Sequence, residues 1–228
     1  GNQTADARPG AQGGAGGGAG RRQRIAAAVP GNGIVGEGDP DEAGDGETRW
    51  SIDPSDGTHN LVRGIPVWAT LIAVEREGEL LAAAVSAPAL QRRWHAGRGN
   101  GAGIQDLLGE RQLHVSQIDQ IKEAQLVWSG LASLQAEGFG AAVEALARDA
   151  WRDRGFGEFW GYMLVAEGAA DAMLEIGPTL WDLAAPALIV REAGGRLTDF
   201  AGRDSYAGPQ SLASNGALHP ALIEVLGR

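Results

Sequence analysis

The chain has 228 residues, enough for a domain with a sizeable core, and no cysteine, so a disulfide framework and a thiolate metal site are excluded. Its net charge is 19 − 29 = −10, which argues against non-specific binding to nucleic acid or to an anionic membrane surface. No apolar run reaches transmembrane length and no signal-peptide pattern is found, so we expect a cytoplasmic protein with no membrane and no nucleic-acid partner.

The first twenty residues are dominated by glycine and alanine, which lose much entropy on ordering and bury little. We therefore expect residues 1–30 to form a flexible segment, with a short helix over 21–29. A short strand is predicted over 33–37, ending at Glu37, and an acidic loop follows over 39–48.

Apolar segments then predict a run of strands. They are expected over 49–53, 66–75, 79–88 and 92–97. The second and third are joined by Arg-Glu-Gly-Glu, a hairpin signal, and the glycine-rich residues 98–103 are expected to turn.

The C-terminal half mixes helices and strands. Helices are predicted over 141–150, 159–168, 180–195 and 219–227, and strands over 170–177 and 196–200. We expect the helix over 180–195 to be amphipathic and capped by Gly194 and Gly195, and Pro186 fits it only within the first turn. This irregular alternation, with hairpins, favours a layered α/β or α+β fold. The main domain is expected over 31–228, in two sub-regions, 31–125 and 126–228.

The stretch DPSDGT carries two carboxylates at a sharp turn. Asp53 lies at a strand end, Pro54 helps to turn the chain, and Asp56 follows. Gly57 permits an unusual φ, and Thr58 can begin a helix whose free N–H groups bind an anion. Taken alone, however, the stretch also fits an ordinary surface Asx turn.

A cation would reconcile these carboxylates with a phosphate. Two carboxylates about 4 Å apart repel by roughly 4 kcal/mol at an effective dielectric of about 20. Mg²⁺ prefers oxygen ligands and commonly bridges carboxylates to phosphate. Taken alone, Asp182 at the start of a helix fits a cap and Glu37 fits a surface glutamate.

Together, the segments GE, WSIDPSDGTHN and WDLAA followed by EAGG resemble the inositol monophosphatase family of Mg²⁺-dependent phosphomonoesterases. The order and approximate spacing of the three motifs agree, and the resemblance runs from about Gly33 to the C-terminus. It implies an alternating α-β-α-β-α sandwich, Mg²⁺ as cofactor, a small phosphate ester as substrate and a homodimer.

The resemblance also implies roles for individual residues. The metal ligands would be the carboxylates of Glu37, Asp53, Asp56 and Asp182 and the carbonyl of Ser55. Asp53 would bridge two ions, Gly57 and Thr58 would donate backbone N–H groups to the phosphate, and Thr58 and Glu37 would orient the attacking water. That water would attack phosphorus in line, without a covalent enzyme intermediate.

The segment RDRGFGEFWGYMLVAEG resembles the histidinol-phosphatase branch. There Glu158 would pair with a substrate ammonium, Glu175 would contact the hydroxyl-bearing part of the substrate, and Arg154 would line the site. Alternatively, Glu158 is an acid favoured at the start of a helix, Glu175 is a surface acid at the end of a strand and Arg154 is a solvated charge in a loop.

The expected reaction is hydrolysis of L-histidinol phosphate to L-histidinol and phosphate, in histidine biosynthesis. An inositol-1-monophosphatase or broad sugar-phosphate phosphatase is the alternative enzyme, and a non-catalytic binding or scaffold relative is the alternative of another class.

Some positions depart from the family pattern. The N-terminal region is short and glycine-rich, so that Asp6 is a poor counterpart for an upstream metal-site aspartate. Gly38 replaces a second glutamate and Ser55 an aliphatic residue, which predicts a weaker supporting shell. His59 adjoins the motif at a variable position, and a surface role is expected for it.

Overall fold

The computed structural model describes residues 20–38, 40–44 and 46–227, and two sheets organise them. In the first sheet the strands lie side by side in chain order, with β1 and β2 parallel and all later pairs antiparallel. They are β1 (Gly33–Gly36), β2 (Thr48–Asp56), β3 (Ala69–Arg76), β4 (Glu79–Ala87), β5 (Arg92–Gly97), β6 (Ala102–Asp106) and β7 (Gly109–Gln112).

The second sheet has the order β11-β12-β10-β8-β9 and mixes parallel and antiparallel pairs. Its strands are β8 (Gln125–Trp128), β9 (Arg152–Arg154), β10 (Ala172–Ile176), β11 (Arg196–Thr198) and β12 (Gln210–Ser214). The helices are residues 20–28, α2 (Thr58–Arg63), α3 (Leu131–Ala136), α4 (Gly140–Asp149), α5 (Glu158–Ala166), α6 (Leu180–Glu192) and α7 (His219–Leu226).

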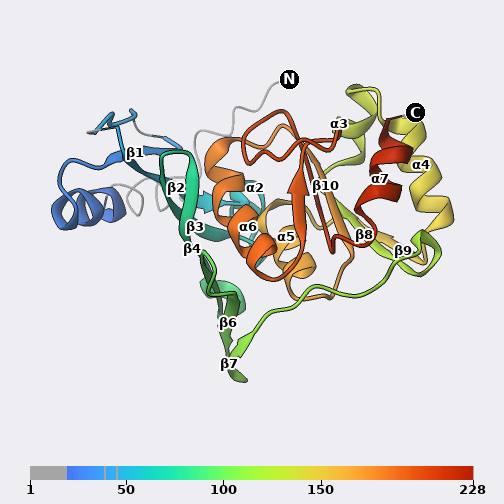
Figure 1. Cartoon of the computed structure of the whole chain (residues 1–228), viewed down its shortest axis with the longest axis horizontal. Helices are drawn as coiled ribbons and strands as arrows, with labels where there is room; N and C mark the ends of the chain where they lie inside the picture. The colour runs from blue at the N-terminus through green and yellow to red at the C-terminus, as the bar shows by residue number, and fades with distance from the viewer. Residues whose placement is uncertain (1–19, 39, 45, 228) are drawn as a thin grey trace.

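These elements form layers (Figure 1). Helices α5 and α6 lie between the two sheets, where a single apolar cluster includes residues of both sheets and both helices. On the far side of the second sheet, α3, α4 and α7 cover a second cluster. Among the described residues, the helix over 20–28 lies beyond β1, at the end of the molecule opposite to α3, α4 and α7. The predicted α-β-α-β-α sandwich is confirmed.

Helix α6 corrects two predictions. It is not amphipathic: every residue from Leu183 to Val190 is buried, because the helix is enclosed between two sheets. Pro186 is the seventh residue of the helix and not part of its first turn. It has no N–H to donate to the carbonyl of Asp182, and the surrounding core holds the helix together despite this loss.

Strand β2 runs on to Asp56 and does not end at Asp53 as predicted. Asp53 pairs with Leu71 of β3 and Asp56 with Ala69, so β2 contains one extra residue at this point, and Pro54, which cannot donate to the ladder, lies within it. In a regular strand, residues three apart face opposite sides. The extra residue therefore allows both aspartates to face the same side.

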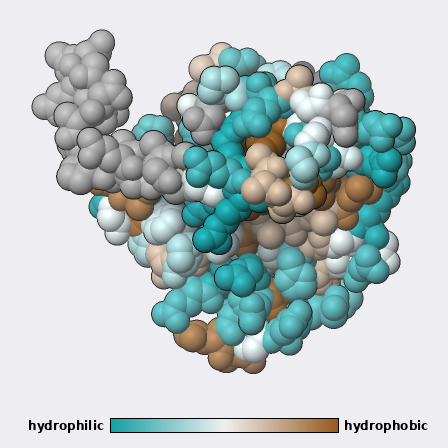
Figure 2. Space-filling view, turned by 90° about the vertical axis from the view of Figure 1, so that its left-hand side faces the viewer, coloured by the Kyte–Doolittle hydropathy of each residue, from teal (hydrophilic) through white to brown (hydrophobic). Residues whose placement is uncertain are grey.

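Other segments were not predicted. The elements β6, β7, β8, β9, β12 and α3 have no counterpart among the elements expected from the sequence. Strands β6 and β7 form a hairpin that projects from the body of the molecule (Figure 1). Its tip carries Leu107 and Leu108, with 80% and 88% of their surface exposed, and brown atoms mark the corresponding lower end of the view in Figure 2.

Part of the N-terminal prediction can be compared with the structure. The predicted short helix is present over 20–28, and the buried Arg22 donates to the carbonyls of Ile34 and Pro40. Residues 1–19, and with them Asp6, lie outside the described residues. None of the described helices is both long enough and apolar enough to cross a membrane.

Candidate active site

A cavity of about 460 Å³ opens where β2, α2, β10 and α6 meet. Its lining includes most of the predicted site residues: Glu37, Asp53, Ser55, Asp56, Gly57, Thr58, Glu158, Glu175 and Asp182. Segments far apart in the chain thus converge on one site, as the resemblance implied.

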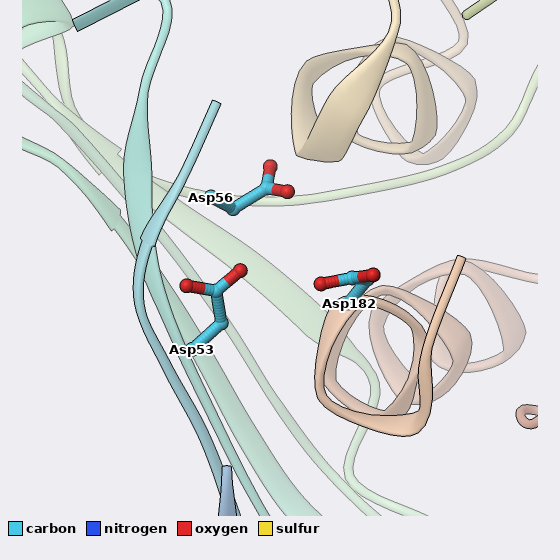
Figure 3. Close-up of side chains that lie close together, drawn as sticks. All are labelled: Asp53, Asp56 and Asp182. Atoms are coloured by element: carbon cyan, nitrogen blue, oxygen red, sulfur yellow. The ribbon is translucent and has the colours of Figure 1, made fainter. Parts of the chain in front are cut away.

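At the centre of this cavity are three aspartates. Asp53, Asp56 and Asp182 each offer a carboxylate oxygen, and these oxygens lie within 4.8 Å of one another. Figure 3 shows the carboxylates of Asp53 and Asp56, from β2, directed toward that of Asp182 at the start of α6. The bulge in β2 is what places the first two together.

Backbone donors fix the two carboxylates of β2. Asp53 Oδ1 accepts a hydrogen bond from the backbone N–H of Ser55 at 2.8 Å. Asp56 Oδ2 accepts one from the N–H of Phe159, at the start of α5, at 2.7 Å. Each backbone bond engages one oxygen of its carboxylate and so fixes the direction of that side chain.

Asp182 is held from within its own helix. Its Oδ2 accepts hydrogen bonds from the backbone N–H of Thr179 at 2.7 Å and from the Thr179 hydroxyl at 2.9 Å. This is a capping box, so the alternative interpretation of Asp182 as a helix cap holds together with its place in the cluster. The Thr-x-x-Asp spacing is a capping-box signal in the sequence and points to Thr179, for which no role was predicted.

Burial makes this cluster electrostatically costly. The pKa of Asp53 rises from 3.8 to about 8, chiefly because of burial, with Glu37 and Asp182 adding repulsion. Burial and the charge of Asp53 raise the pKa of Asp56 well above its ordinary value. No arginine or lysine forms an ion pair with the three aspartates in the part of the chain that the structure describes. These oxygens are therefore suited to a bound cation.

The turn after Asp56 has the backbone geometry expected from the sequence. Gly57 has φ 80°, and a Cβ there would lie 2.7 Å from the carbonyl oxygen of Val67, so a side chain is excluded. Helix α2 begins at Thr58, as predicted. The Thr58 hydroxyl donates to the Ser55 carbonyl at 2.8 Å, which ties it to the oxygen predicted to bind metal.

The two predicted substrate carboxylates, Glu158 and Glu175, also line the cavity. Glu158 is half-buried, burial raises its pKa, and it accepts a hydrogen bond from Asn60 Nδ2 at 3.2 Å. Its φ of 47° is unusual for a side-chain-bearing residue, as is common at functional sites. Glu175, at the end of β10, accepts a hydrogen bond from the hydroxyl of Tyr162 at 2.6 Å. Burial raises the pKa of Glu175 to about 7.

Arg154 is not among the residues that line the cavity. It is exposed on β9 and donates to the carbonyl of its neighbour Asp153 at 2.6 Å, so its substrate role stays a prediction without support from this arrangement. Conversely, His59, Ser129 and Ser133 line the cavity although no substrate role was predicted for them. The two serines belong to no sequence motif. Only the packing of the second sheet brings them to the cavity.

Comparison with known proteins gives the family of the chain. The model of the inositol monophosphatase family matches residues 21–228. A histidinol-phosphatase of Streptomyces coelicolor is 45% identical over 82% of this chain and 72% of its own length, and one of Mycobacterium tuberculosis is 42% identical over 89% and 78%. The solved Thermotoga maritima IMPase has a TM-score of 0.79 and 28% identity, covering 90% of this chain and 78% of its own. The chain belongs to the inositol monophosphatase family, as its motifs predicted.

Proposed function

We propose that the protein is a Mg²⁺-dependent phosphomonoesterase that hydrolyses L-histidinol phosphate. The observation that carries the proposal is the charge of the cavity: six carboxylates line it, and His59 is the sole basic side chain among the described lining residues. A phosphate dianion would be repelled here unless cations neutralise the aspartates. The similarity to two proteins named histidinol-phosphatase supports the substrate.

The residues present fit Mg²⁺. They would hold it through the carboxylates of Glu37, Asp53, Asp56 and Asp182 and the carbonyl of Ser55, all of which line the cavity. When bound, the ion neutralises charge on the phosphoryl oxygens and lowers the pKa of water. Phosphate-monoester hydrolysis is among the slowest uncatalysed reactions, so the barrier to be lowered is large.

The chain's own groups would divide the remaining work. Gly57 and Thr58 would donate backbone N–H groups to the phosphate, since they lie beside the aspartates on the same wall. Glu37 and the Thr58 hydroxyl would orient the attacking water. Elsewhere in the lining, Glu158 would pair with the substrate ammonium and Glu175 with a donor of the leaving group, which explains two further carboxylates in a phosphate site.

The related proposals follow from the same assignment. We propose a role in histidine biosynthesis and a cytoplasmic location, and a homodimer is expected from the family resemblance. An inositol-1-monophosphatase or broader sugar-phosphate phosphatase remains the second candidate enzyme, favoured by the likeness to the Thermotoga maritima IMPase.

A substrate panel tests the proposal. Phosphate release from L-histidinol phosphate, inositol 1-phosphate and a sugar phosphate is measured at matched concentrations, with Mg²⁺ and with EDTA. We expect Mg²⁺-dependent release with histidinol phosphate preferred. Preference for inositol phosphate would select the second candidate. No release from any ester would leave a non-catalytic relative, the alternative of another class.

A further inference from the structure

One tyrosine lies directly behind Glu175. Tyr162, on α5, has 1% of its surface exposed and does not line the cavity. Its hydroxyl donates a 2.6 Å hydrogen bond to Oε2 of Glu175, which does line the cavity. The phenol thus reaches the site only through that carboxylate.

The surroundings keep Tyr162 in the role of donor. Burial, together with the charge of Glu175, raises the pKa of Tyr162 well above its ordinary value, against a smaller opposing effect of the Ser211 hydroxyl. The phenol therefore remains protonated at any physiological pH. Ser211 is fully buried on β12 and lies opposite Glu175 in the strand register.

This contact fixes the direction of the glutamate. A glutamate side chain has several rotamers, and one bond to a buried, rigid phenol selects among them. With Oε2 occupied by Tyr162, Oε1 is the oxygen left for the cavity. The same hydrogen bond favours the ionised carboxylate against the cost of burial.

We propose that Tyr162 is a positioning residue that aims Glu175 at the hydrogen-bond donor of the leaving group, and thereby contributes to substrate selection. The ligand class is a phosphate ester whose leaving group carries an ammonium or hydroxyl near the ester oxygen. The inference rests on the proposed phosphomonoesterase function but not on which of the two candidate substrates is correct.

The Tyr162→Phe variant tests this, with Tyr206→Phe as a matched control. Tyr206 also donates a 2.6 Å hydrogen bond to a glutamate, Glu75, but neither residue lines the cavity. The kinetics are measured with histidinol phosphate and inositol 1-phosphate, which carry donors, and with p-nitrophenyl phosphate, whose leaving group has none.

For Tyr162→Phe we expect KM to rise about tenfold for both donor-bearing esters, the loss typical of a hydrogen bond to a charged group. KM for p-nitrophenyl phosphate, and kcat for all three, should stay within about twofold of wild type, as should every constant of Tyr206→Phe. Product inhibition supplies a second readout: the Ki of L-histidinol should rise and that of inorganic phosphate should not.

Two further variants separate positioning from simple support of the fold. If Tyr162 acts through Glu175, adding Tyr162→Phe to Glu175→Gln should cause no further loss. Glu175→Asp, which retracts the carboxylate from the phenol without altering α5, should reproduce the selective rise in KM even if Tyr162→Phe fails to fold. Equal losses on all three esters, an additive double variant or an unaffected Glu175→Asp would each overturn the inference.

If the wild-type protein releases no phosphate from any ester, the proposed function fails before this comparison begins. If it is active but Tyr162→Phe keeps wild-type KM for the donor-bearing esters, only the positioning role is lost. The two failures are therefore distinguishable.

Discussion

Two groups of residues that line the cavity are held by different kinds of hydrogen-bond contact. We call Glu37, Asp53, Ser55, Asp56 and Asp182 the metal end, and His59, Ser129, Ser133, Glu158 and Glu175 the substrate wall. At the metal end, the donors to Asp53 and Asp182 lie two or three residues away in the chain, whereas the donor to Asp56 is Phe159, 103 residues away. In the substrate wall, contacts join residues farther apart.

The contact between Asn60 and Glu158 illustrates the second kind, since it spans 98 residues. The contact between Tyr162 and Glu175 joins a helix of the central layer to a strand of the second sheet. Two of the three aspartates are thus held by short local motifs, whereas Asp56 and both glutamates of the substrate wall depend on how the layers pack. Four predictions test this division.

The largest effect is expected at the metal end. Asp182→Asn replaces a charged ligand with a neutral one of the same size. Loss of a residue that only supports a metal ligand typically costs roughly 10–100-fold, so Mg²⁺-dependent phosphate release should fall by more than this. Circular dichroism should show an intact fold. Asp149→Asn, at an exposed site, is the matched control. Retained activity would refute the ligand assignment.

The capping box should matter next. Thr179→Ala removes one of the two donors to Asp182 Oδ2, so the Mg²⁺ concentration for half-maximal activity should rise about 10–100-fold. The free energy of unfolding should fall by about 1 kcal/mol, as for a lost cap. Thr179→Ser keeps the hydroxyl and should restore both. An unchanged Mg²⁺ titration in the alanine variant would show that the metal end does not need this local support.

In the substrate wall, Glu158→Gln should act on one substrate only. A charge-assisted contact with an ammonium contributes about 1.5–3 kcal/mol, so kcat/KM for histidinol phosphate should fall at least about tenfold. Inositol 1-phosphate has no ammonium and serves as the internal control. Equal losses on both substrates would reject the ammonium pairing and leave Glu158 as a structural acid.

The smallest effect concerns stability and pH. Without metal, the pKa of Asp53 is about 8 in the folded chain and 3.8 ordinarily. Between these two pH values the folded state therefore binds a proton that the unfolded state has released. That stabilisation is complete below a pH of about 4 and is lost as the pH rises through about 8. Mg²⁺ must displace this proton, so it should raise the unfolding temperature more at pH 8 than at pH 5.

The measurement is thermal unfolding with EDTA and with Mg²⁺ at both pH values, for wild type and Asp53→Asn. The variant should lose this pH-dependent part of the Mg²⁺ effect. A larger Mg²⁺ shift at pH 5 than at pH 8 would contradict the assignment of the raised pKa to a metal-binding carboxyl.

Much of the metal end was predictable. Each motif alone was ambiguous, and it was the resemblance of the three motifs together to one family that pointed to Asp53, Asp56 and Asp182, which the structure brings within 4.8 Å of one another. The bulge in β2 was not predicted, since it depends on pairing with β3. Helix α6 was assigned as amphipathic for a similar reason: its apolar residues suggested one buried face, and only the second sheet shows why all faces are buried.

By itself, the sequence indicated the family through its motifs, and with it the carboxylates proposed to bind metal and the glycine turn beside them, because these motifs are short and depend on residue type and local backbone geometry. Tertiary structure decided which side chains form the substrate wall. It brought Tyr162 behind Glu175 and Asn60 to Glu158, placed His59, Ser129 and Ser133 at the cavity, and left Arg154 outside it. Such contacts depend on the packing of whole layers, and no local pattern in the chain encodes them.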